Sequence, residues 1–195
     1  MDDPDHRYRS APAPRRGVPA LFLDRDGTLI EDPGYLSDPA AVRVLPGVPE
    51  ALRRFRDAGH ALVVVTNQSG IGRSLYGWDD YEAVSARLRD LLAAEGITLD
   101  AELACGHAPE AGAACGWRKP GAGMILSAAQ RLDLDLSHSL LAGDKRIDIE
   151  AAVAAGLPRA AHVATGQGAS ERGKLVGARF PLDLEYLEDL SGLAP

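Results

Sequence analysis

The sequence predicts an α/β fold, a single Rossmann-like domain with a central parallel sheet and helices on both faces. Two patterns predict it: short continuous apolar runs alternate along the chain with segments of helical periodicity, and most of those segments close on a glycine. Strands that alternate with helices build parallel sheets covered on both sides. The length of 195 residues suits one domain, and 46% hydrophobic residues suffice for a packed core.

The predicted strands are apolar runs without polar alternation, which is typical of strands buried on both faces. The two clearest are 20–24 (ALFLD) and 61–67 (ALVVVTN). Three more runs of this kind are predicted as strands at 99–104, 138–144 and 159–165.

The predicted helices lie between these runs. Apolar residues recur at helical spacing over 47–59 and 78–96, and each segment ends in glycine. At the start of the second segment, Asp79 and Glu82 predict a capping box. The segment 180–193 stays ambiguous, with a terminal helix as one interpretation. Two further helices are predicted at 121–134 and 148–156.

The chain start and the composition narrow the class of protein. Residues 1–19 are rich in proline, arginine and aspartate and lack a signal-peptide apolar segment, so we expect a flexible N-terminal segment before the folded domain at 20–195. A net charge of −7, from 21 basic and 28 acidic residues, argues against nucleic acid or an anionic membrane as partner. No apolar run nears the length of a membrane span, and the two cysteines are too few for a disulfide scaffold. We expect a cytoplasmic protein and a monomer.

Polar side chains follow three of the predicted strands: Asp24, Thr66 with Asn67, and Asp144. The carboxyl ends of parallel strands meet at one edge, where open sheets bind their ligands. Asp24 and Asp26 allow two interpretations. One is that they cap a turn at the following glycine. The other is a metal site, because like charges this close repel unless a cation neutralises them, and oxygen ligands without histidine suit Mg²⁺.

The same residues predict chemistry on a phosphate group. A carboxylate such as Asp24 can attack phosphorus and form an aspartyl-phosphate, while Asp26 can protonate the leaving alkoxide and later activate water. Lys119, in the segment RKPG, is the candidate cation for the phosphate oxygens. Its alternative is a solvated surface lysine.

Four segments, FLDRDGT, VVVTNQSGI, RKPG and AGDKRID, resemble the motifs of the haloacid-dehalogenase-like (HAD-like) phosphohydrolases, in the same order and across residues 20–165. DRDGTLIEDPGYL, TNQSGIGR and a C-x-H…C pattern before RKP are similar to one branch of this family. That branch removes the 7-phosphate of D-glycero-D-manno-heptose 1,7-bisphosphate and is related to the histidinol-phosphate phosphatases. Its members lack a large cap domain, so the resemblance implies none here.

The resemblance also implies roles for the matching carboxylates. Asp24 is implied as the nucleophile and Asp26 as the general acid and base. Mg²⁺ is implied to bind the Asp24 carboxylate, the Asp26 backbone carbonyl and Asp144, with Asp148 supporting the metal. Lys119 matches the lysine that stabilises the charge on the phosphoaspartate.

Further positions match the family's phosphate and substrate contacts. Thr66 and Asn67 match the motif that hydrogen-bonds the transferring phosphate. Arg118 and Lys145 could meet a second phosphate, or be surface charges. Tyr35 fits either core packing or a platform for the sugar. The implied substrate contacts are Asp32, Pro33, Gly34, Tyr35, Gln68, Ser69, Arg118 and Lys145.

The loop 105–118 departs from the family pattern. The resemblance implies a zinc site of the form C-x-H…C-x-C, and Cys105, His107 and Cys115 match it, but Trp117 stands at the last ligand position. Structural zinc is almost always four-coordinate. Three interpretations stay open: zinc with three ligands plus water or another group, a lost site whose loop is held by packing, or a disulfide, which a reducing cytosol disfavours.

These observations predict a Mg²⁺-dependent phosphatase that acts on a small phosphorylated sugar. The heptose bisphosphate is the preferred substrate in this prediction. One alternative is histidinol phosphate or another small phosphomonoester as substrate. Another is a non-catalytic protein that binds a phosphorylated ligand. The joint presence of Asp24, Asp26, Lys119 and Asp144 argues against the last, since a sensor would not need all four.

Overall fold

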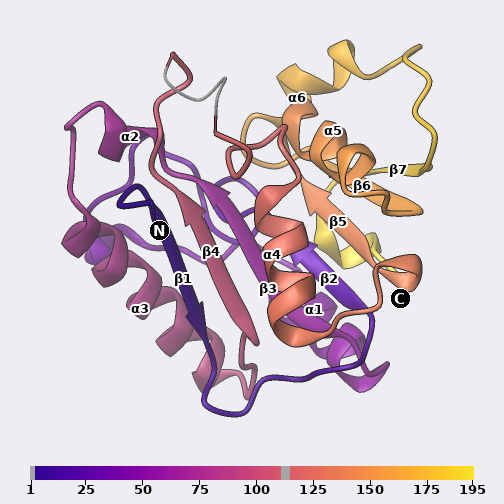
Figure 1. The fold of residues 1–195 in the computed structure, drawn as a ribbon, viewed down its shortest axis with the longest axis horizontal. Helices are drawn as coiled ribbons and strands as arrows, with labels where there is room; N and C mark the ends of the chain where they lie inside the picture. Colours follow the sequence, from indigo (N-terminus) through magenta and orange to yellow (C-terminus); the bar gives the residue numbers. More distant parts are fainter. Residues whose placement is uncertain (1–2, 111–114) are drawn as a thin grey trace.

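The structure, a computed structural model, describes residues 3–110 and 115–195, and a seven-stranded sheet forms its centre (Figure 1). The strands lie in the order β1-β4-β3-β2-β5-β6-β7. Neighbouring strands are parallel except for β1, which runs antiparallel to β4. The strands are His6–Ser10 (β1), Ala20–Leu23 (β2), Ala61–Asn67 (β3), Ala101–Cys105 (β4), Leu140–Gly143 (β5), Arg159–Val163 (β6) and Asp183–Leu187 (β7).

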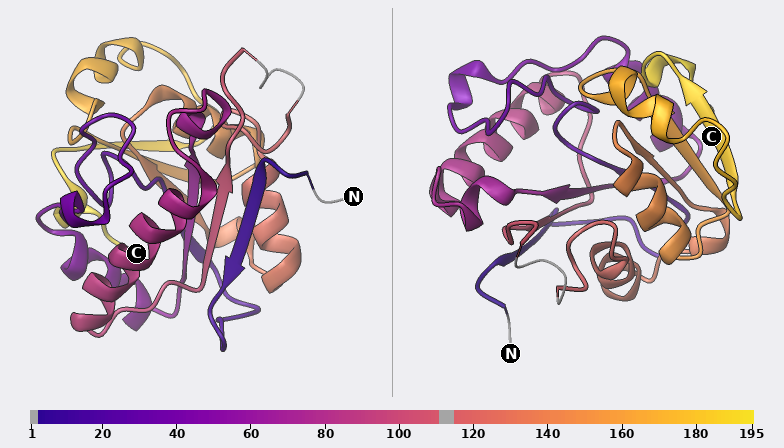
Figure 2. Two further views of the ribbon diagram at one scale, coloured as in Figure 1. Left: turned by 90° about the vertical axis from the view of Figure 1, so that its left-hand side faces the viewer. Right: turned by 90° about the horizontal axis from the view of Figure 1, so that it is seen from above.

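Helices cover both faces of the sheet, with α1 and α3 on one side and α4 and α5 on the other (Figure 2). Within residues 3–110 and 115–195, no helix has the length and apolar character needed to cross a membrane. The helices are Val48–Asp57 (α1), Ser69–Gly72 (α2), Trp78–Ala94 (α3), Gly123–Leu132 (α4), Arg146–Ala154 (α5) and Gly168–Glu171 (α6).

Each face of the sheet has its own apolar core. Side chains alternate along a strand, so Leu21 and Leu23 of β2 join the cluster under α1 and α3. Ala20 and Phe22 join the cluster under α4 and α5. Burial on both faces explains why the strand is apolar at every position. The predicted α/β fold, with its five strands and four main helices, is confirmed.

The expectation of a flexible N-terminal segment is wrong for residues 6–10, which form the edge strand β1. Along this strand the half-buried side chains of His6, Tyr8 and Ser10 alternate with the exposed side chains of Arg7 and Arg9. Charged outward residues are usual on edge strands, where they discourage pairing with other chains. This polar composition gave the segment no apolar run by which to recognise it.

Two other local predictions are also wrong. The segment 180–193 is not a terminal helix: it contains β7, which pairs in parallel with β6, and a short 3₁₀ turn. At the start of α3, the carboxylate that reaches back is Asp80, whose Oδ2 accepts a hydrogen bond from the Gly77 N–H at 2.8 Å. Asp80 takes this place, rather than Asp79 or Glu82, because it lies three residues after Gly77, the residue that precedes the helix.

Candidate active site

The three polar strand ends meet at one edge of the sheet, as predicted. β3, β2 and β5 are neighbours, so Thr66, Asp24 and Asp144 come together from distant parts of the sequence. A cavity of about 270 Å³ opens at this edge. The predicted site residues in its lining are Asp24, Asp26, Asp32, Gly34, Tyr35, Thr66, Asn67, Gln68, Ser69, Arg118, Lys119, Lys145 and Asp148.

Lys119 contacts two buried carboxylates. Its Nζ lies 2.7 Å from Oδ1 of Asp24 and 2.6 Å from Oδ1 of Asp148. Burial is the largest single influence on Asp24 and opposes its ionisation, but the charges of Lys119 and Lys145, together with hydrogen bonds from Lys119 and the Arg25 backbone, outweigh it and lower the pKa of this carboxyl. Burial likewise opposes the charge on Lys119, yet Asp148 and Asp24 raise its pKa. The interpretation of Lys119 as a surface lysine is wrong, since only 3% of the residue is exposed.

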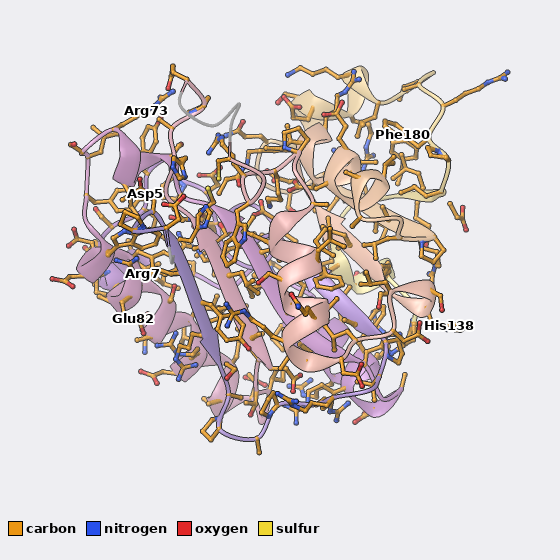
Figure 3. All side chains as sticks on the ribbon, viewed as in Figure 1. Asp5, Arg7, Arg73, Glu82, His138 and Phe180 are labelled. Atoms are coloured by element: carbon orange, nitrogen blue, oxygen red, sulfur yellow. The ribbon has the colours of Figure 1, made fainter. Side chains whose placement is uncertain are left out.

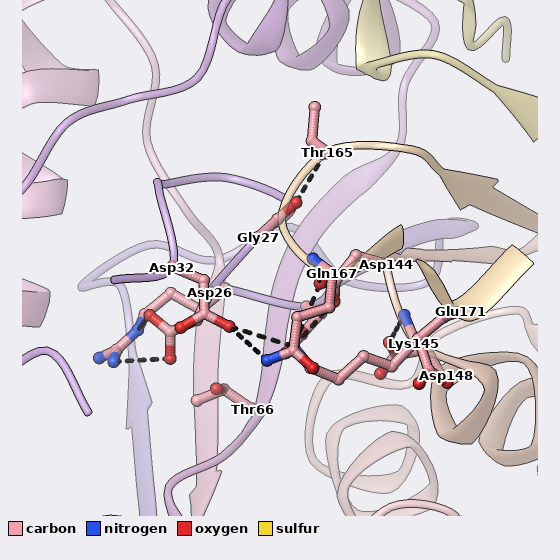
Figure 4. Close-up of polar contacts among 12 residues, drawn as sticks. Asp26, Gly27, Asp32, Thr66, Asp144, Lys145, Asp148, Thr165, Gln167 and Glu171 are labelled. Carbon is pink, nitrogen blue, oxygen red and sulfur yellow. Dashed lines mark hydrogen bonds and ion pairs between the residues drawn. The ribbon is translucent and has the colours of Figure 1, made fainter. Parts of the chain in front are cut away.

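Asp144 is a fully buried carboxylate, labelled next to Gln167 in Figure 4. Oxygens of Asp24, Asp144 and Asp148 all lie within 4.8 Å of one another. Burial, and then the charge of Asp24, raise the pKa of Asp144 to about 7. Its oxygens contact Lys145 Nζ at 3.1 Å and the backbone N–H of Gln167 at 2.8 Å. A cluster of oxygen ligands with this excess of negative charge fits a hard divalent cation such as Mg²⁺.

Two glycines leave the room that the Asp144 carboxylate occupies. A Cβ added to Gly27 would lie 2.4 Å from Oδ2 of Asp144, and one added to Gly166 would lie 2.6 Å from the same atom. Both glycines have positive φ angles, of +87° and +57°. The Thr165 hydroxyl donates to the Gly27 carbonyl at 2.6 Å, which joins the two loops. Gly27 is therefore required by the close approach of Asp144 as well as by its turn.

The Asp26 carboxylate is held by a buried arginine. Arg25 donates from Nε to Oδ1 at 3.0 Å and from Nη2 to Oδ2 at 2.9 Å, a bidentate pair. Arg25 is 1% exposed, so this pair belongs to the framework of the site. The two aspartates of the DRDGT motif therefore have different partners, Lys119 for Asp24 and Arg25 for Asp26.

Gln68 orders several residues around Asp26. Its Nε2 donates to Oδ2 of Asp26 and to Oγ1 of Thr66, both at 2.8 Å. Its Oε1 accepts from Arg25 at 2.9 Å and from the Tyr76 hydroxyl at 2.6 Å. Although Gln68 borders the cavity, both N–H groups and the carbonyl of its side chain are used inside the protein. These hydrogen bonds give Gln68 a positioning role, and the substrate contact implied for it stays a prediction.

Asn67 has a similar positioning role. Its Oδ1 accepts from the backbone N–H of Lys119, and its Nδ2 donates to the Lys119 carbonyl, both at 3.0 Å. This amide pair fixes the backbone of the catalytic lysine candidate. The bond to the phosphate that the resemblance implied for Asn67 stays a prediction, since the residue also lines the cavity.

The predicted substrate loop forms one rim of the cavity. Oδ2 of Asp32 lies 3.4 Å from Nζ of Lys145, which connects this rim to the acidic cluster. Tyr35 is 45% exposed and accepts a hydrogen bond from Arg73 at 2.6 Å, so core packing is excluded for it. Pro33, between them, does not line the cavity.

Sequence reasoning did not find four residues of the lining: Leu36, Tyr76, Ile147 and Gln167. Gln167 lies in the loop after β6, and its side chain donates to Asp32 at 3.2 Å while its backbone binds Asp144. One indication of a site role for Gln167 was present in the sequence: it follows a predicted strand, at the same edge of the sheet as the polar residues that end the other strands. Tyr76 had no comparable signal, because a loop between two helices brings it to Gln68.

The three predicted zinc-loop residues lie together but do not line the cavity. Sγ of Cys105 is 3.5 Å from Nδ1 of His107 and 3.6 Å from Sγ of Cys115. Both thiols are free, so the structure contains no disulfide between them. Nη1 of Arg118 donates to the His107 carbonyl at 2.7 Å, which connects this loop to the cavity.

Known proteins are similar to this chain in sequence. A family model described as polynucleotide kinase 3 phosphatase matches residues 20–151, and a HAD-hydrolase-like model matches residues 116–193. A D-glycero-beta-D-manno-heptose-1,7-bisphosphate 7-phosphatase from Yersinia pestis is 37% identical over 164 residues, which cover 82% of this chain and 87% of the relative. The chain belongs to the HAD-like phosphatases.

Other relatives of this HAD-like phosphatase carry the same name as the Yersinia protein. The relative from Mesorhizobium japonicum is 46% identical over 145 residues, covering 72% of this chain and 67% of the relative. The relative from Escherichia coli K12 is 40% identical over 157 residues, covering 78% of this chain and 82% of the relative. The resemblance found in the motifs is thereby confirmed.

Solved structures extend the likeness to the whole fold of this HAD-like phosphatase. A HAD-like phosphatase from Mesorhizobium loti superposes with a TM-score of 0.79 at 37% identity, covering 90% of this chain and 93% of the other. A D,D-heptose 1,7-bisphosphate phosphatase from B. bronchiseptica, complexed with magnesium and phosphate, gives a TM-score of 0.78 at 33% identity. It covers 88% of this chain and 94% of the other.

Proposed function

We propose that this HAD-like phosphatase removes the 7-phosphate of D-glycero-D-manno-heptose 1,7-bisphosphate in a Mg²⁺-dependent reaction with an aspartyl-phosphate intermediate. One observation carries the proposal: the ionised Asp24 lies at a strand end between the Lys119 ammonium and the carboxylate of Asp144. Relatives named for this reaction, at 37–46% identity, support the substrate. The relative complexed with magnesium and phosphate supports the metal.

The residues that would hold the ion are Asp24, the backbone carbonyl of Asp26, and Asp144, with Asp148 beside them. When bound, Mg²⁺ neutralises this acidic cluster and stabilises charge on the phosphate oxygens. The ionised form of Asp144, whose pKa is raised to about 7, is favoured by that charge.

The remaining chemistry belongs to side chains of this chain. An oxygen of Asp24 forms a bond to phosphorus as the bond from phosphorus to the ester oxygen breaks, and Asp26 gives its proton to that leaving oxygen. Water then attacks phosphorus, Asp26 takes a proton from it, and Asp24 leaves as a carboxylate with inorganic phosphate as product. Lys119, 2.7 Å from Asp24, stabilises the charge on the phosphate oxygens in both steps.

The cations around the cavity favour a substrate with two phosphates. Besides Lys119, the side chains of Arg118 and Lys145 line it, and both can bind a second phosphate. Histidinol phosphate carries an ammonium group in place of that phosphate and gains nothing from these cations. The exposed Tyr35 on the rim provides a flat surface for the sugar.

The test is turnover of a panel of phosphate esters by the purified protein with and without Mg²⁺. We expect the heptose bisphosphate to be hydrolysed with the highest kcat/KM and only in the presence of Mg²⁺. Faster hydrolysis of histidinol phosphate than of the heptose bisphosphate would contradict the proposed substrate and favour the histidinol-phosphate alternative.

Asp24→Asn tests the covalent step, with Asp90→Asn, an exposed residue of α3, as the matched control. We expect Asp24→Asn to abolish turnover, because a neutral amide is a poor nucleophile, and Asp90→Asn to keep it. Beryllium fluoride, which mimics the phosphoryl group, should bind on Asp24 in a crystal of the wild-type protein. Near-normal turnover by Asp24→Asn would exclude the covalent mechanism.

A further inference from the structure

The N-terminal strand delivers a histidine to the cysteine loop. In the antiparallel pair of β1 and β4, His6 lies directly opposite Cys105, so their side chains are on the same side of the sheet. The pairing continues past the strand end, where the Gly106 N–H donates to the carbonyl of Asp5 at 2.7 Å. Figure 3 shows Asp5 at this end of β1, beside the loop that follows β4.

His6 completes a group of four possible metal ligands. Its Nε2 lies 3.1 Å from Sγ of Cys115. That sulfur is 3.6 Å from Sγ of Cys105, which is 3.5 Å from Nδ1 of His107. All four ligand atoms lie within 4.8 Å of one another. Tetrahedral zinc, with bonds of about 2.3 Å to sulfur and about 2.0 Å to nitrogen, separates its ligand atoms by roughly 3.3–3.8 Å. Three of the six separations in the cluster, at 3.1, 3.5 and 3.6 Å, are already close to these values.

Trp117, which cannot bind metal, holds the ring of His6 in place. The two rings are stacked, with centroids 4.4 Å apart and planes 8° from parallel. The residue at the lost ligand position of the loop thus orients a ligand that comes from another part of the chain. A stacked ring loses little rotamer freedom on binding an ion, which favours binding.

Two carboxylates surround the far nitrogen of His107. Its Nε2 lies 3.6 Å from Oδ2 of Asp5 and 3.8 Å from Oδ2 of Asp3, while its Nδ1 faces Cys105. These distances are longer than hydrogen bonds, but the two negative charges favour a proton on Nε2 of His107, which leaves Nδ1 as the nitrogen that can bind a metal.

We infer that His6, Cys105, His107 and Cys115 form a tetrahedral zinc site whose fourth ligand, His6, comes from the N-terminal strand. Binding releases the two thiol protons to solvent, and the two thiolates then balance the charge of Zn²⁺, with both imidazoles neutral. The ion joins β1 to the loop that leads to Arg118, whose guanidinium donates to the His107 carbonyl. The site is separate from the acidic cluster and does not depend on which phosphate ester is the substrate.

The first experiment measures metal content and the absorption spectrum of the Co²⁺-substituted protein. Wild-type protein, dialysed against a weak chelator, should keep one zinc per chain and give the intense visible bands of tetrahedral Co²⁺. His6→Ala should lower zinc affinity by more than roughly 10- to 100-fold, which is the loss expected when the removed residue only hydrogen-bonds to a metal ligand. His138→Ala is the matched control, because His138 is exposed and bonded to Asp135, far from sulfur. Wild-type protein without zinc, or His6→Ala with wild-type affinity, would overturn the inference.

A second variant should increase an absorption band instead of removing one. Its result therefore does not depend on whether His6→Ala is stably folded. His6→Cys replaces one nitrogen ligand by a third thiolate, and thiolate-to-cobalt charge transfer in the near ultraviolet should therefore rise by about half. An unchanged band would place residue 6 outside the coordination sphere.

In a His6→Ala background, Trp117→Cys restores the loop pattern of the family and should restore zinc binding. Failure of all three effects, with thiol titration showing a Cys105–Cys115 disulfide, would show that the pair is redox-active instead.

Discussion

Nζ of Lys119 lies 2.7 Å from Oδ1 of Asp24, and both side chains are almost fully buried. The lysine therefore does two things: with Lys145 it favours the ionised form of Asp24 against the effect of burial, and it places a cation where the transferred phosphate gains charge. It also pairs with Asp148, so three buried charges depend on one another.

Lys119→Met should lower kcat by roughly 100- to 1,000-fold, because the cation at the reacting phosphate is lost. It should also destabilise the fold by up to about 3–5 kcal/mol, since two buried carboxylates lose their partner. Urea unfolding and steady-state kinetics measure the two effects. Adding Asp148→Asn to this variant should recover part of the stability but none of the turnover. Recovery of turnover would mean that Lys119 acts only through the fold.

Gln68→Leu should lower kcat at least tenfold while KM changes little, because Asp26 and Thr66 lose the donor that positions them. It removes one hydrogen-bond partner from the buried Arg25 and one from the half-buried Tyr76, at a cost of about 1–3 kcal/mol in stability. Tyr76→Phe is the control, since it removes one of the four hydrogen bonds of Gln68 and leaves Asp26 in place. Equal losses of kcat in both variants would contradict the positioning of Asp26 by Gln68.

Gly27→Ala should abolish turnover and Mg²⁺ binding, because the new methyl group would lie 2.4 Å from Oδ2 of Asp144. Gly96→Ala is the matched control, with φ +73° and no atom within 4 Å of the added Cβ. Both variants should lose about 1–2 kcal/mol of folding stability, because alanine is strained in the left-handed backbone conformation. The control therefore separates backbone strain from the clash with Asp144. Thermal unfolding with and without Mg²⁺ should show metal stabilisation in wild type and in Gly96→Ala. Equal metal stabilisation in Gly27→Ala would refute the role of this close approach.

His162 should make the fold sensitive to acid. The residue is fully buried in β6, and neither ring nitrogen has a hydrogen-bond partner among the described residues. Burial, and then the charge of Arg172, lower the pKa of His162 below its usual 6.5. As the pH falls below about 6.5, the unfolded chain takes up a proton that the native state excludes, so stability falls by at most about 2 kcal/mol at pH 5.

His162→Leu should therefore lose less in Tm than wild type when the pH is lowered from about 7.5 to about 5, because the variant has no proton to take up at this position. The exposed His138→Leu serves as the control. If wild type and His162→Leu lose the same number of degrees, the buried imidazole does not contribute to acid sensitivity.

The central strands and the active-site carboxylates could be predicted from the sequence, because a single physical constraint determines the residue types at each of these positions. Burial on both faces made 61–67 apolar at every position, and the structure has that strand with the predicted bounds. The polar residues Asp24, Thr66 and Asp144 end such runs at one edge of the sheet, where Asp24 and Thr66 line the cavity and Asp144 lies buried behind it. The edge strands β1 and β7 were missed, because a strand buried on at most one side needs no apolar run.

The sequence by itself determined the layers of the fold, the order of the motifs and the chemistry of the site, since local periodicity and residue type carry that information. Only the tertiary structure decided which residues face the ligand and which hold others in place, as for Gln68 and Asn67. It also decided that His6 lies opposite Cys105. Strand register and side-chain contacts join residues nearly a hundred positions apart, and no local pattern in the chain records such a pairing.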